Sequence, residues 1–522
     1  MIPIGSTFGG VIFTVIMAII LIAGILVGLF LITRNAGKPK EKIYKGSVIP
    51  VTLLIIGAVG LTIRIVFALL VRGYRDDIRL MSDLIEVGFG GIDVIYGGGV
   101  FGASPTTASP MMVYIMSVMG GFASLFGIEA ETVGMQFLIK LPFILADLGV
   151  FILLYFIASR YLNKVISIVL ASLVYLNPVV FWNSSISGGF NSISALMLLG
   201  VLYLMLRRQF LAMIILYGIA VLTSGFALWF FPPLAILLGY YAVRAVYHIR
   251  KQNYGIKDKR IFTDADARPI ISVPLYIILT LLGMYIITIP LMQAYDSFHF
   301  FNVFFNYFLI QPFGNVTVFG NNSLSIYNIF LRNQLLLGSG FPNTVFAWAF
   351  VGLVFGIVAF VYFSKKNRAN LALASIYGAM TVALFFVGFR ENTLVVMLPL
   401  LILAYIIIQD KRIVHIFALF SIILLINSAT VMISASWLNN ATIGELTAAG
   451  FGGLEHHLTS GAGRVINIIC SALAVMTFIY FTYILLDISM SHNRRQIKTF
   501  ESKPNFADAI ADWVTWKKRK GE

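Results

Sequence analysis

The stretch FLIKLPFILADLGVFILLYFIASRYLNK, residues 137–164, decides the fold class of this chain. It holds roughly the twenty consecutive apolar residues that an α-helix needs to cross the hydrocarbon core of a bilayer, which is about 30 Å thick. A basic cluster, Arg160–Lys164, follows directly. An apolar run closed by cations is typical of a transmembrane helix that ends at the cytoplasmic surface.

Runs of this kind recur along the whole chain. Of its 522 residues, 59% are hydrophobic and only 11% are charged, whereas a soluble domain has about 25% charged residues. The sequence therefore predicts an all-α, polytopic helical membrane protein. The single cysteine, Cys470, excludes an internal disulfide framework and a CxxC metal or redox site. The apolar runs are 9–32 (expected to be a retained first span), 49–72, 108–127, 136–158, 165–180, 192–206, 209–223, 226–243, 270–291, 343–363, 369–388, 393–408, 413–435 and 465–487.

The net charge of +15 has a topological explanation. Placing every large cationic cluster in the cytoplasm satisfies the positive-inside rule, so the basic balance does not indicate nucleic-acid binding. The clusters are Arg34–Lys45, Arg160–Lys164, Arg207–Arg208, Arg244–Arg268, Lys365–Arg368, Lys411–Arg412 and the tail after His492.

This placement works only if the run 108–127 does not cross the membrane. Ser109-Pro110 and Gly120-Gly121 are weak points for a helix within it. We therefore expect about thirteen transmembrane helices, a semi-embedded helical hairpin at 108–127, an outside N-terminus and a cytoplasmic C-terminus; the alternative is fourteen plain crossings. The expected parts are an N-terminal span with a basic loop (1–48), a core module (49–243) with an outer loop at 73–135, a basic loop (244–269), a C-terminal transmembrane module (270–487) with outer loops 292–342 and 436–464, and a basic tail (488–522).

An acidic segment begins the first outer loop. GYRDDIRLMSDLIEVGFGG, residues 73–91, places Asp76 and Asp77 side by side at the expected membrane boundary. Adjacent carboxylates can raise one another's pKa, so that one serves as a base, or can bind a divalent metal. The alternative is a solvated loop helix whose arginines pair with the carboxylates. The sequence leaves any cofactor unknown.

Three other features carry polar groups near or within the membrane. NPVVFWNSSISGGFNS (177–192) breaks the helical pattern and needs protein or a cavity around it, unless it is an ordinary turn. FVGFRENTL places Arg390 beside Glu391, where the arginine can bind a phosphate or simply pair with the glutamate. Lys140 and Asp147 lie within one span at spacing i, i+7, and intramembrane charges favour a functional role, although Lys140 can also snorkel to the surface.

Residues 137–164, followed by LASLVYLNPVVFWNSSISGGFNSISALMLL (170–199), resemble the core of the GT-C glycosyltransferases, integral membrane enzymes that take sugars from polyprenyl-phosphate carriers. SPMMVYIMSVMG, LTSGFALWFFPPLAILL and FRENTLVVMLPLLILAY resemble further elements of the prokaryotic mannosyltransferase-like branch. The resemblance implies that Asp77 is the general base and that Arg390 and Glu391 lie near the lipid phosphate. We expect the substrate-binding residues to be Asp76, Asn191, Ser224, Arg390, Glu391 and the intramembrane Lys140.

The sequence departs from that family at three polar positions. The WGQxD motif reads Ser187-Gly188-Gly189-Phe190-Asn191, so its tryptophan and aspartate are missing. Ser224 stands where the family has a lysine, and Arg390 where it has a histidine. A different substrate would explain these changes, and so would loss of catalysis.

The resemblance predicts an inverting membrane glycosyltransferase in the cell membrane. It would transfer a sugar from a polyprenyl-phosphate carrier to a glycan or glycolipid acceptor of the cell envelope, among membrane lipids and without nucleic acid. The first alternative is a catalytically inactive relative that binds the lipid carrier or a partner enzyme and regulates glycan assembly. The second is a transporter of lipid-linked sugars, with Lys140 and Asp147 on its path.

Overall fold

The computed structural model describes residues 7–35, 48–71, 109–129, 132–252, 264, 267–292, 324–330, 341–364, 368–386, 393–440 and 461–490. Throughout these residues the regular structure is helical. Each predicted apolar run coincides with one helix or with a pair of helices in sequence, because long apolar segments satisfy their backbone hydrogen bonds internally. The helices are α1 (Thr7–Asn35), α2 (Val48–Leu70), α5 (Pro110–Leu125), α6 (Val133–Tyr161), α7 (Lys164–Tyr175), α8 (Pro178–Phe181), η1 (Trp182–Ser187), α9 (Asn191–Leu206), α10 (Phe210–Thr223), η2 (Gly225–Phe230), α11 (Phe231–Lys251), α13 (Pro269–Met292), α16 (Tyr327–Phe330), α17 (Phe341–Ser364), α18 (Arg368–Phe385), η5 (Thr393–Val396), α19 (Met397–Ile408), α20 (Lys411–Asn440) and α23 (Gly461–Met490).

The helices confirm a polytopic helical membrane protein. In the described part of the chain, seven helices are long and apolar enough to cross a bilayer, or eight if one bent pair forms a single span. Six shorter apolar helices accompany them. The number of thirteen crossings stays a prediction.

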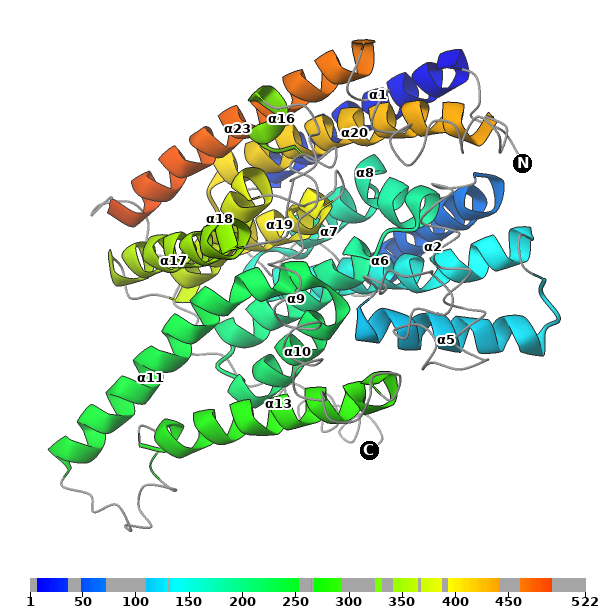
Figure 1. Cartoon of the computed structure of the whole chain (residues 1–522). Helices are drawn as coiled ribbons and strands as arrows, with labels where there is room; N and C mark the ends of the chain where they lie inside the picture. The colour runs from blue at the N-terminus through cyan, green and yellow to red at the C-terminus, as the bar shows by residue number, and fades with distance from the viewer. Residues whose placement is uncertain are drawn as a thin grey trace, which may run out of the picture.

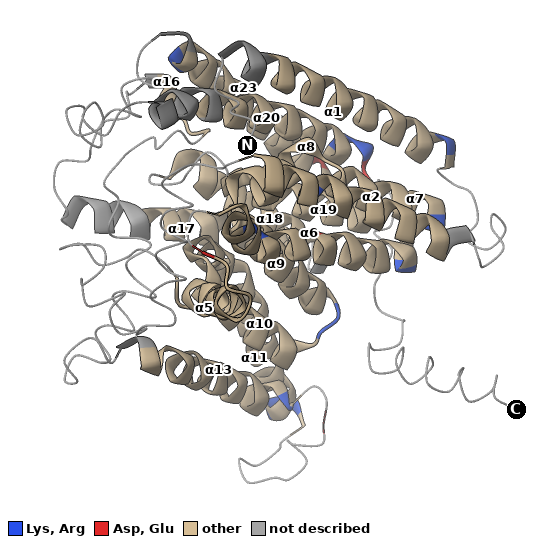
Figure 2. Ribbon diagram, turned by 90° about the vertical axis from the view of Figure 1, so that its right-hand side faces the viewer, with Lys and Arg blue, Asp and Glu red and all other residues tan. Residues whose placement is uncertain are grey.

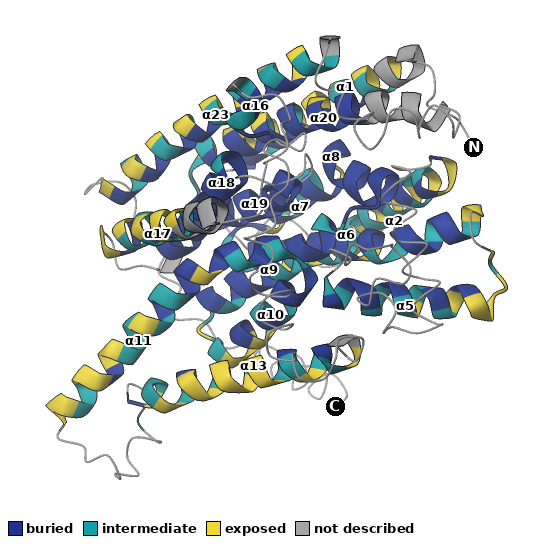
Figure 3. Cartoon of the chain, in the orientation of Figure 1, coloured by how far each residue is buried: buried dark blue, intermediate teal, exposed yellow. Residues whose placement is uncertain are grey.

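The core of the bundle is a pair of central helices, α18 and α19. Every described residue from Met397 to Ile407 is buried, so α19 has no lipid-facing side. Figure 3 shows buried residues concentrated in α18, α19, α9 and α7, and exposed residues along the outer sides of α13, α17 and α23. Most of the exposed side chains of α13 are leucine and isoleucine, as expected for a surface that faces lipid tails.

The helices α2 and α6 run antiparallel (Figure 1). Arg64 contacts Asp147, and seven residues further along α2 the carbonyl of Val71 contacts Lys140, seven residues earlier in α6. This is the relative direction that the predicted topology requires if the intervening run does not cross.

That intervening run forms α5, which lies beside α6 and is joined to it by a short connection (Figure 1). It is a single helix and not the expected hairpin, because Pro110 occupies its first turn, where proline is tolerated. The helix continues through Gly120-Gly121, with Gly120 packed in the interior. The hairpin is formed by α5 together with α6.

The cationic clusters gather at one end of the bundle. Figure 2 shows Lys and Arg at the ends of α1, α6 and α7 and between α9 and α10. Asn163, which begins α7, donates a hydrogen bond to the carbonyl of Asn35 at the end of α1. At the same end Arg412 bridges Asp410 and Asp487, with N–O distances of 2.7 and 2.6 Å. We refer to this as the basic end of the bundle.

Candidate functional site

The candidate site lies at a broken membrane span. The α7 helix ends at Tyr175, and the chain continues into α8 and η1 with a bend of 44°. Asn177 accepts a hydrogen bond from the backbone N–H of Val179, and Pro178 lacks a backbone N–H, so a new helix begins there. Within it, Trp182–Ser187 forms a π-helix, a rare conformation that often marks functional sites. It ends at Gly188, whose φ of 70° favours glycine.

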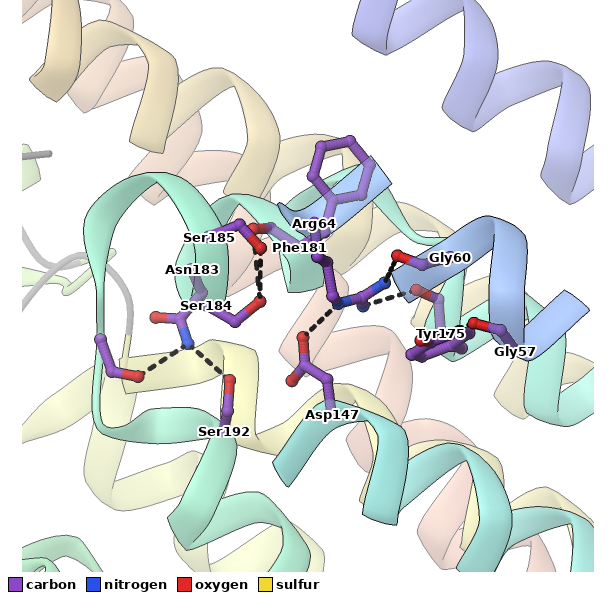
Figure 4. Close-up of polar contacts among 11 residues, drawn as sticks. Gly57, Gly60, Arg64, Asp147, Tyr175, Phe181, Asn183, Ser184, Ser185 and Ser192 are labelled. Carbon is purple, nitrogen blue, oxygen red and sulfur yellow. Dashed lines mark hydrogen bonds and ion pairs between the residues drawn. The ribbon is translucent and has the colours of Figure 1, made fainter. Parts of the chain in front are cut away.

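A buried ion pair lies against this break. The Nε atom of Arg64, on α2, is 2.9 Å from the Oδ2 atom of Asp147, on α6 (Figure 4). Both side chains are almost completely buried, with exposed fractions of 0% and 2%. Because isolated charges in the membrane interior are costly, each ion stabilises the other.

Both terminal nitrogens of Arg64 also donate hydrogen bonds to backbone carbonyls. Its Nη2 atom donates to the carbonyl oxygen of Tyr175 at 2.6 Å, and its Nη1 atom donates to that of Gly60 at 3.2 Å. The guanidinium also lies over the ring of Tyr175, 4.1 Å from the centroid. The Tyr175 carbonyl is at the last turn of α7, where the helix leaves its carbonyl groups without intrahelical partners. Arg64 therefore stabilises the bend itself.

A group of hydroxyl and amide side chains lies next to this ion pair, in η1 and at the start of α9 (Figure 4). The hydroxyl groups of Ser184 and Ser185 pair at 3.3 Å. Asn183 donates to the Oγ of Ser192 at 3.2 Å and to the carbonyl of Gly189 at 3.4 Å, and the Gly189 N–H donates back to the Asn183 carbonyl at 2.7 Å (Figure 4 draws the side-chain contacts). The predicted substrate residue Asn191 donates to the Oδ1 of Asn183 at 3.4 Å.

Lys140, the second predicted intramembrane ion, does not pair with Asp147. Its Nζ atom donates to the carbonyl of Val71 at 2.7 Å, at the end of α2. Gln136 donates to the same carbonyl at 2.5 Å and to that of Ala68 at 2.9 Å. Both side chains therefore satisfy the C-terminal carbonyls of α2, and Lys140 is buried rather than snorkelling.

Ser224 has a local structural role. It begins η2, where its Oγ accepts a hydrogen bond from the N–H of Phe226 at 3.3 Å. The preceding Thr223 contacts Met197, about 9 Å along α9 from Asn191 by helical rise. The structure thus joins Asn191, Asn183 and Ser192 by hydrogen bonds, and it places Ser224 at a separate helix start.

The other predicted site residues lie outside the described residues. They are Asp76, Asp77, Arg390 and Glu391, together with the metal site considered at the first two. Within the described ranges, three or more His, Cys, Asp or Glu residues do not come together in a way that could hold a metal ion.

Sequence reasoning did not identify Arg64 as the partner of Asp147. The signal was present, because consecutive antiparallel spans that carry one cation and one anion at similar depth can pair in the membrane. The spacing of Lys140 and Asp147 suggested a pairing on one helix, whereas the partner of Asp147 is on the neighbouring helix α2.

The fold and this site define a class: a multi-pass helical membrane protein with a buried ion pair, Arg64–Asp147, between two of its helices. A family model described as "GPI transamidase subunit PIG-U" matches residues 93–319, a little under half of the chain. The matched range includes α5, Asp147 and Asn191, whereas Arg64 lies before it. No match to a curated protein was found.

These results correct the predicted activity. The matched family is a subunit of a transamidase, so the prediction of a polyprenyl-phosphate-dependent glycosyltransferase is wrong. The structure offers a physical reason at position 191, where an amide has replaced the carboxylate and is held by Asn183. The catalytic role predicted for Asp77 depended on that reaction and ends with it.

Proposed function

We propose that this chain is a non-catalytic subunit of a membrane-embedded complex, which uses a GT-C-like scaffold to bind a partner protein. The single observation that carries the proposal is that polar groups at the broken span are paired with one another. There the charges of Arg64 and Asp147 satisfy each other, and the position of the missing acid is a hydrogen-bonded amide. Such contacts stabilise a fold. They leave neither the Asp147 carboxylate nor the amide at position 191 to act as a general base.

The match to a GPI transamidase subunit supports the same proposal and names the class of partner. We propose that the partner is a transamidase-type enzyme and that the complex acts at a glycolipid. In this proposal the N-terminus lies outside, the basic end of the bundle faces the cytoplasm, the crossings number thirteen, and the division into core and C-terminal modules at 244–269 holds.

Affinity purification of the tagged full-length chain from its native membranes in a mild detergent tests the proposal. The expected result is a defined complex in which the chain and at least one other protein are present in a fixed ratio. The Asn191→Asp variant provides the matched chemical test, because it restores an acid at this position. We expect it to gain no sugar-transfer activity; such a gain would contradict the proposal.

A further inference from the structure

The buried charges of the described helices do not balance. The charged side chains that are buried there are Arg64, Lys140 and Asp147. Arg64 and Asp147 offset each other through their contact of 2.9 Å. Lys140 is the remaining cation, and its exposed fraction is 0%. Within the described ranges, the interior therefore carries one uncompensated positive charge.

The contacts of Lys140 compensate this charge only in part. Its Nζ atom donates to the carbonyl of Val71 at 2.7 Å, and Gln136 uses the same carbonyl. The carboxyl end of a helix such as α2 carries a partial charge of about −0.5, whereas an ammonium group carries a full charge and three N–H donors. In the part of the chain that the structure describes, a carboxylate does not lie within ion-pair distance of Lys140.

A buried cation of this kind needs an anion. Removing an ion from water is costly, and charged groups inside membrane proteins are therefore paired or belong to a functional site. Asp147 is about 10 Å away along α6 by helical rise, and it is already paired with Arg64. The anion that completes this site therefore comes from outside the described helices.

The lysine also borders the broken span. A Cβ atom at Gly188 would be 3.6 Å from the Cγ atom of Lys140, and beyond the adjoining chain it would meet no other described atom within 4 Å. By contrast, a Cβ atom at Gly149, on the same helix as Lys140, would overlap Leu196 at 2.9 Å. The packing beside the lysine is therefore open on the side of the turn from η1 to α9.

The chemistry of Lys140 selects the class of ligand. A lysine ammonium is a compact point charge that binds phosphate groups, whereas a carboxylate is better matched by the planar fork of an arginine. Phosphate is also the anionic group of membrane lipids, which reach a residue on a membrane-spanning helix from the bilayer. A phosphate group, on a lipid or free in solution, is therefore the expected anion.

We propose that Lys140 binds a phosphate group beside the Gly188-Gly189 turn. The site goes beyond the subunit function, because it requires only this chain and involves no transfer of a group. It assigns the buried cation to a ligand, whereas the other explanation assigns it to the carbonyl end of α2 alone.

Binding is tested on the full-length chain, purified and immobilised in a non-ionic detergent. The probes are ³²P-labelled dodecyl phosphate, which represents a lipid phosphate, and ³²P-labelled inorganic phosphate. We expect saturable binding of one dodecyl phosphate per chain and at least tenfold weaker binding to Lys140→Gln, because a hydrogen bond to a charged group is lost. Glutamine keeps an N–H donor for the Val71 carbonyl but removes the charge.

The matched control is Lys164→Gln. Lys164 is exposed at the start of α7, so this variant should bind dodecyl phosphate within about twofold of wild type. Equal affinity for inorganic phosphate would identify free phosphate as the ligand, and binding of dodecyl phosphate alone would identify a lipid; both results support the site. If neither probe binds saturably, or if Lys140→Gln binds as well as wild type, the proposal is wrong and Lys140 serves only the end of α2.

A second measurement decides the question if Lys140→Gln fails to elute at the wild-type size. The wild-type chain is irradiated with dodecyl phosphate that carries a diazirine on its first carbon, and the adducts are located by mass spectrometry. We expect adducts on residues 136–144 or 186–190 that excess dodecyl phosphate suppresses. Adducts confined to other segments would contradict the proposal.

The phosphate site and the subunit function fail separately. The phosphate site is tested on the chain alone, whereas the subunit function is tested on the complex from native membranes. Phosphate binding by a chain that has no partner would leave the site intact and the subunit function wrong. A complex whose isolated chain binds neither probe would show the reverse.

Discussion

At the scale of single residues, the decisive feature is a cation on one span that pairs with an anion on the next. Arg64 and Asp147 are separated by 83 residues in sequence but by 2.9 Å in space. A buried pair of this kind contributes little net stability relative to apolar residues, but the loss of one partner leaves the other ion buried alone.

Removal of one ion should therefore be worse than removal of both. We expect Arg64→Met or Asp147→Leu alone to lower the free energy of unfolding by about 3–5 kcal/mol, and the double variant to lie closer to wild type. Thermal unfolding of the purified chain, followed by tryptophan fluorescence, measures this. A double variant that loses as much free energy of unfolding as the two single variants together, or more, would show that the ions do not compensate each other.

Two glycines of α2 provide a matched test of the ring that covers Arg64. A Cβ atom at Gly60 would overlap the ring of Tyr175, whereas one at Gly57 would be 3.9 Å from its nearest neighbour. We expect Gly60→Ala to displace Tyr175 from Arg64 and to destabilise the protein by about 1–3 kcal/mol, in the range of overpacking.

Gly57→Ala is the control, and it should be neutral or stabilising, because alanine is the better helix former by about 1 kcal/mol. The same unfolding assay compares the two. Equal effects would show that Tyr175 is not held against Arg64.

At the scale of helices, the broken span is the feature that departs from regular geometry. The π-helix η1 ends at Gly188 in the left-handed conformation. A Cβ atom at Gly188 would be 3.6 Å from the Cγ of Lys140, an ordinary contact, so the cost of a side chain there comes from the backbone alone.

We expect Gly188→Ala to destabilise the chain by about 1–2 kcal/mol, the cost of a left-handed conformation for a residue with a Cβ atom. Gly239→Ala in α11 is the control, since a Cβ atom there would meet nothing within 4 Å. Denaturation in detergent measures both. A Gly188→Ala protein as stable as the Gly239→Ala protein would mean that the turn relaxes at no cost.

The helices themselves could be predicted well, and the network between them only in part. Apolar runs of sufficient length must form helices in a membrane, and every predicted run does so. The pairing of Arg64 with Asp147 depends on the register between α2 and α6, which is set by packing and not by local sequence. Gly120-Gly121 in α5 misled the prediction, because packing against α6 and α10 outweighs the low helix propensity of glycine.

At the scale of the whole molecule, the chain is a multi-pass helical bundle whose sequence resembles a group of enzymes and whose described interior holds a buried ion pair. The resemblance to the GT-C enzymes predicted the architecture of a multi-pass bundle. It predicted the wrong reaction, because a fold does not determine an activity. The substitution of an amide at position 191 was the sequence signal for this difference, and the match to a transamidase subunit supports the same interpretation.

The most direct test of the central claim is the composition of the particle that contains this chain. The tagged full-length protein is extracted from native membranes, and its mass is measured by light scattering corrected for detergent, with its components identified by mass spectrometry. The account predicts a particle well above the 57.8 kDa of the chain, with a second protein in a fixed ratio. A particle that contains only this chain would contradict the claim that it is a subunit of a complex.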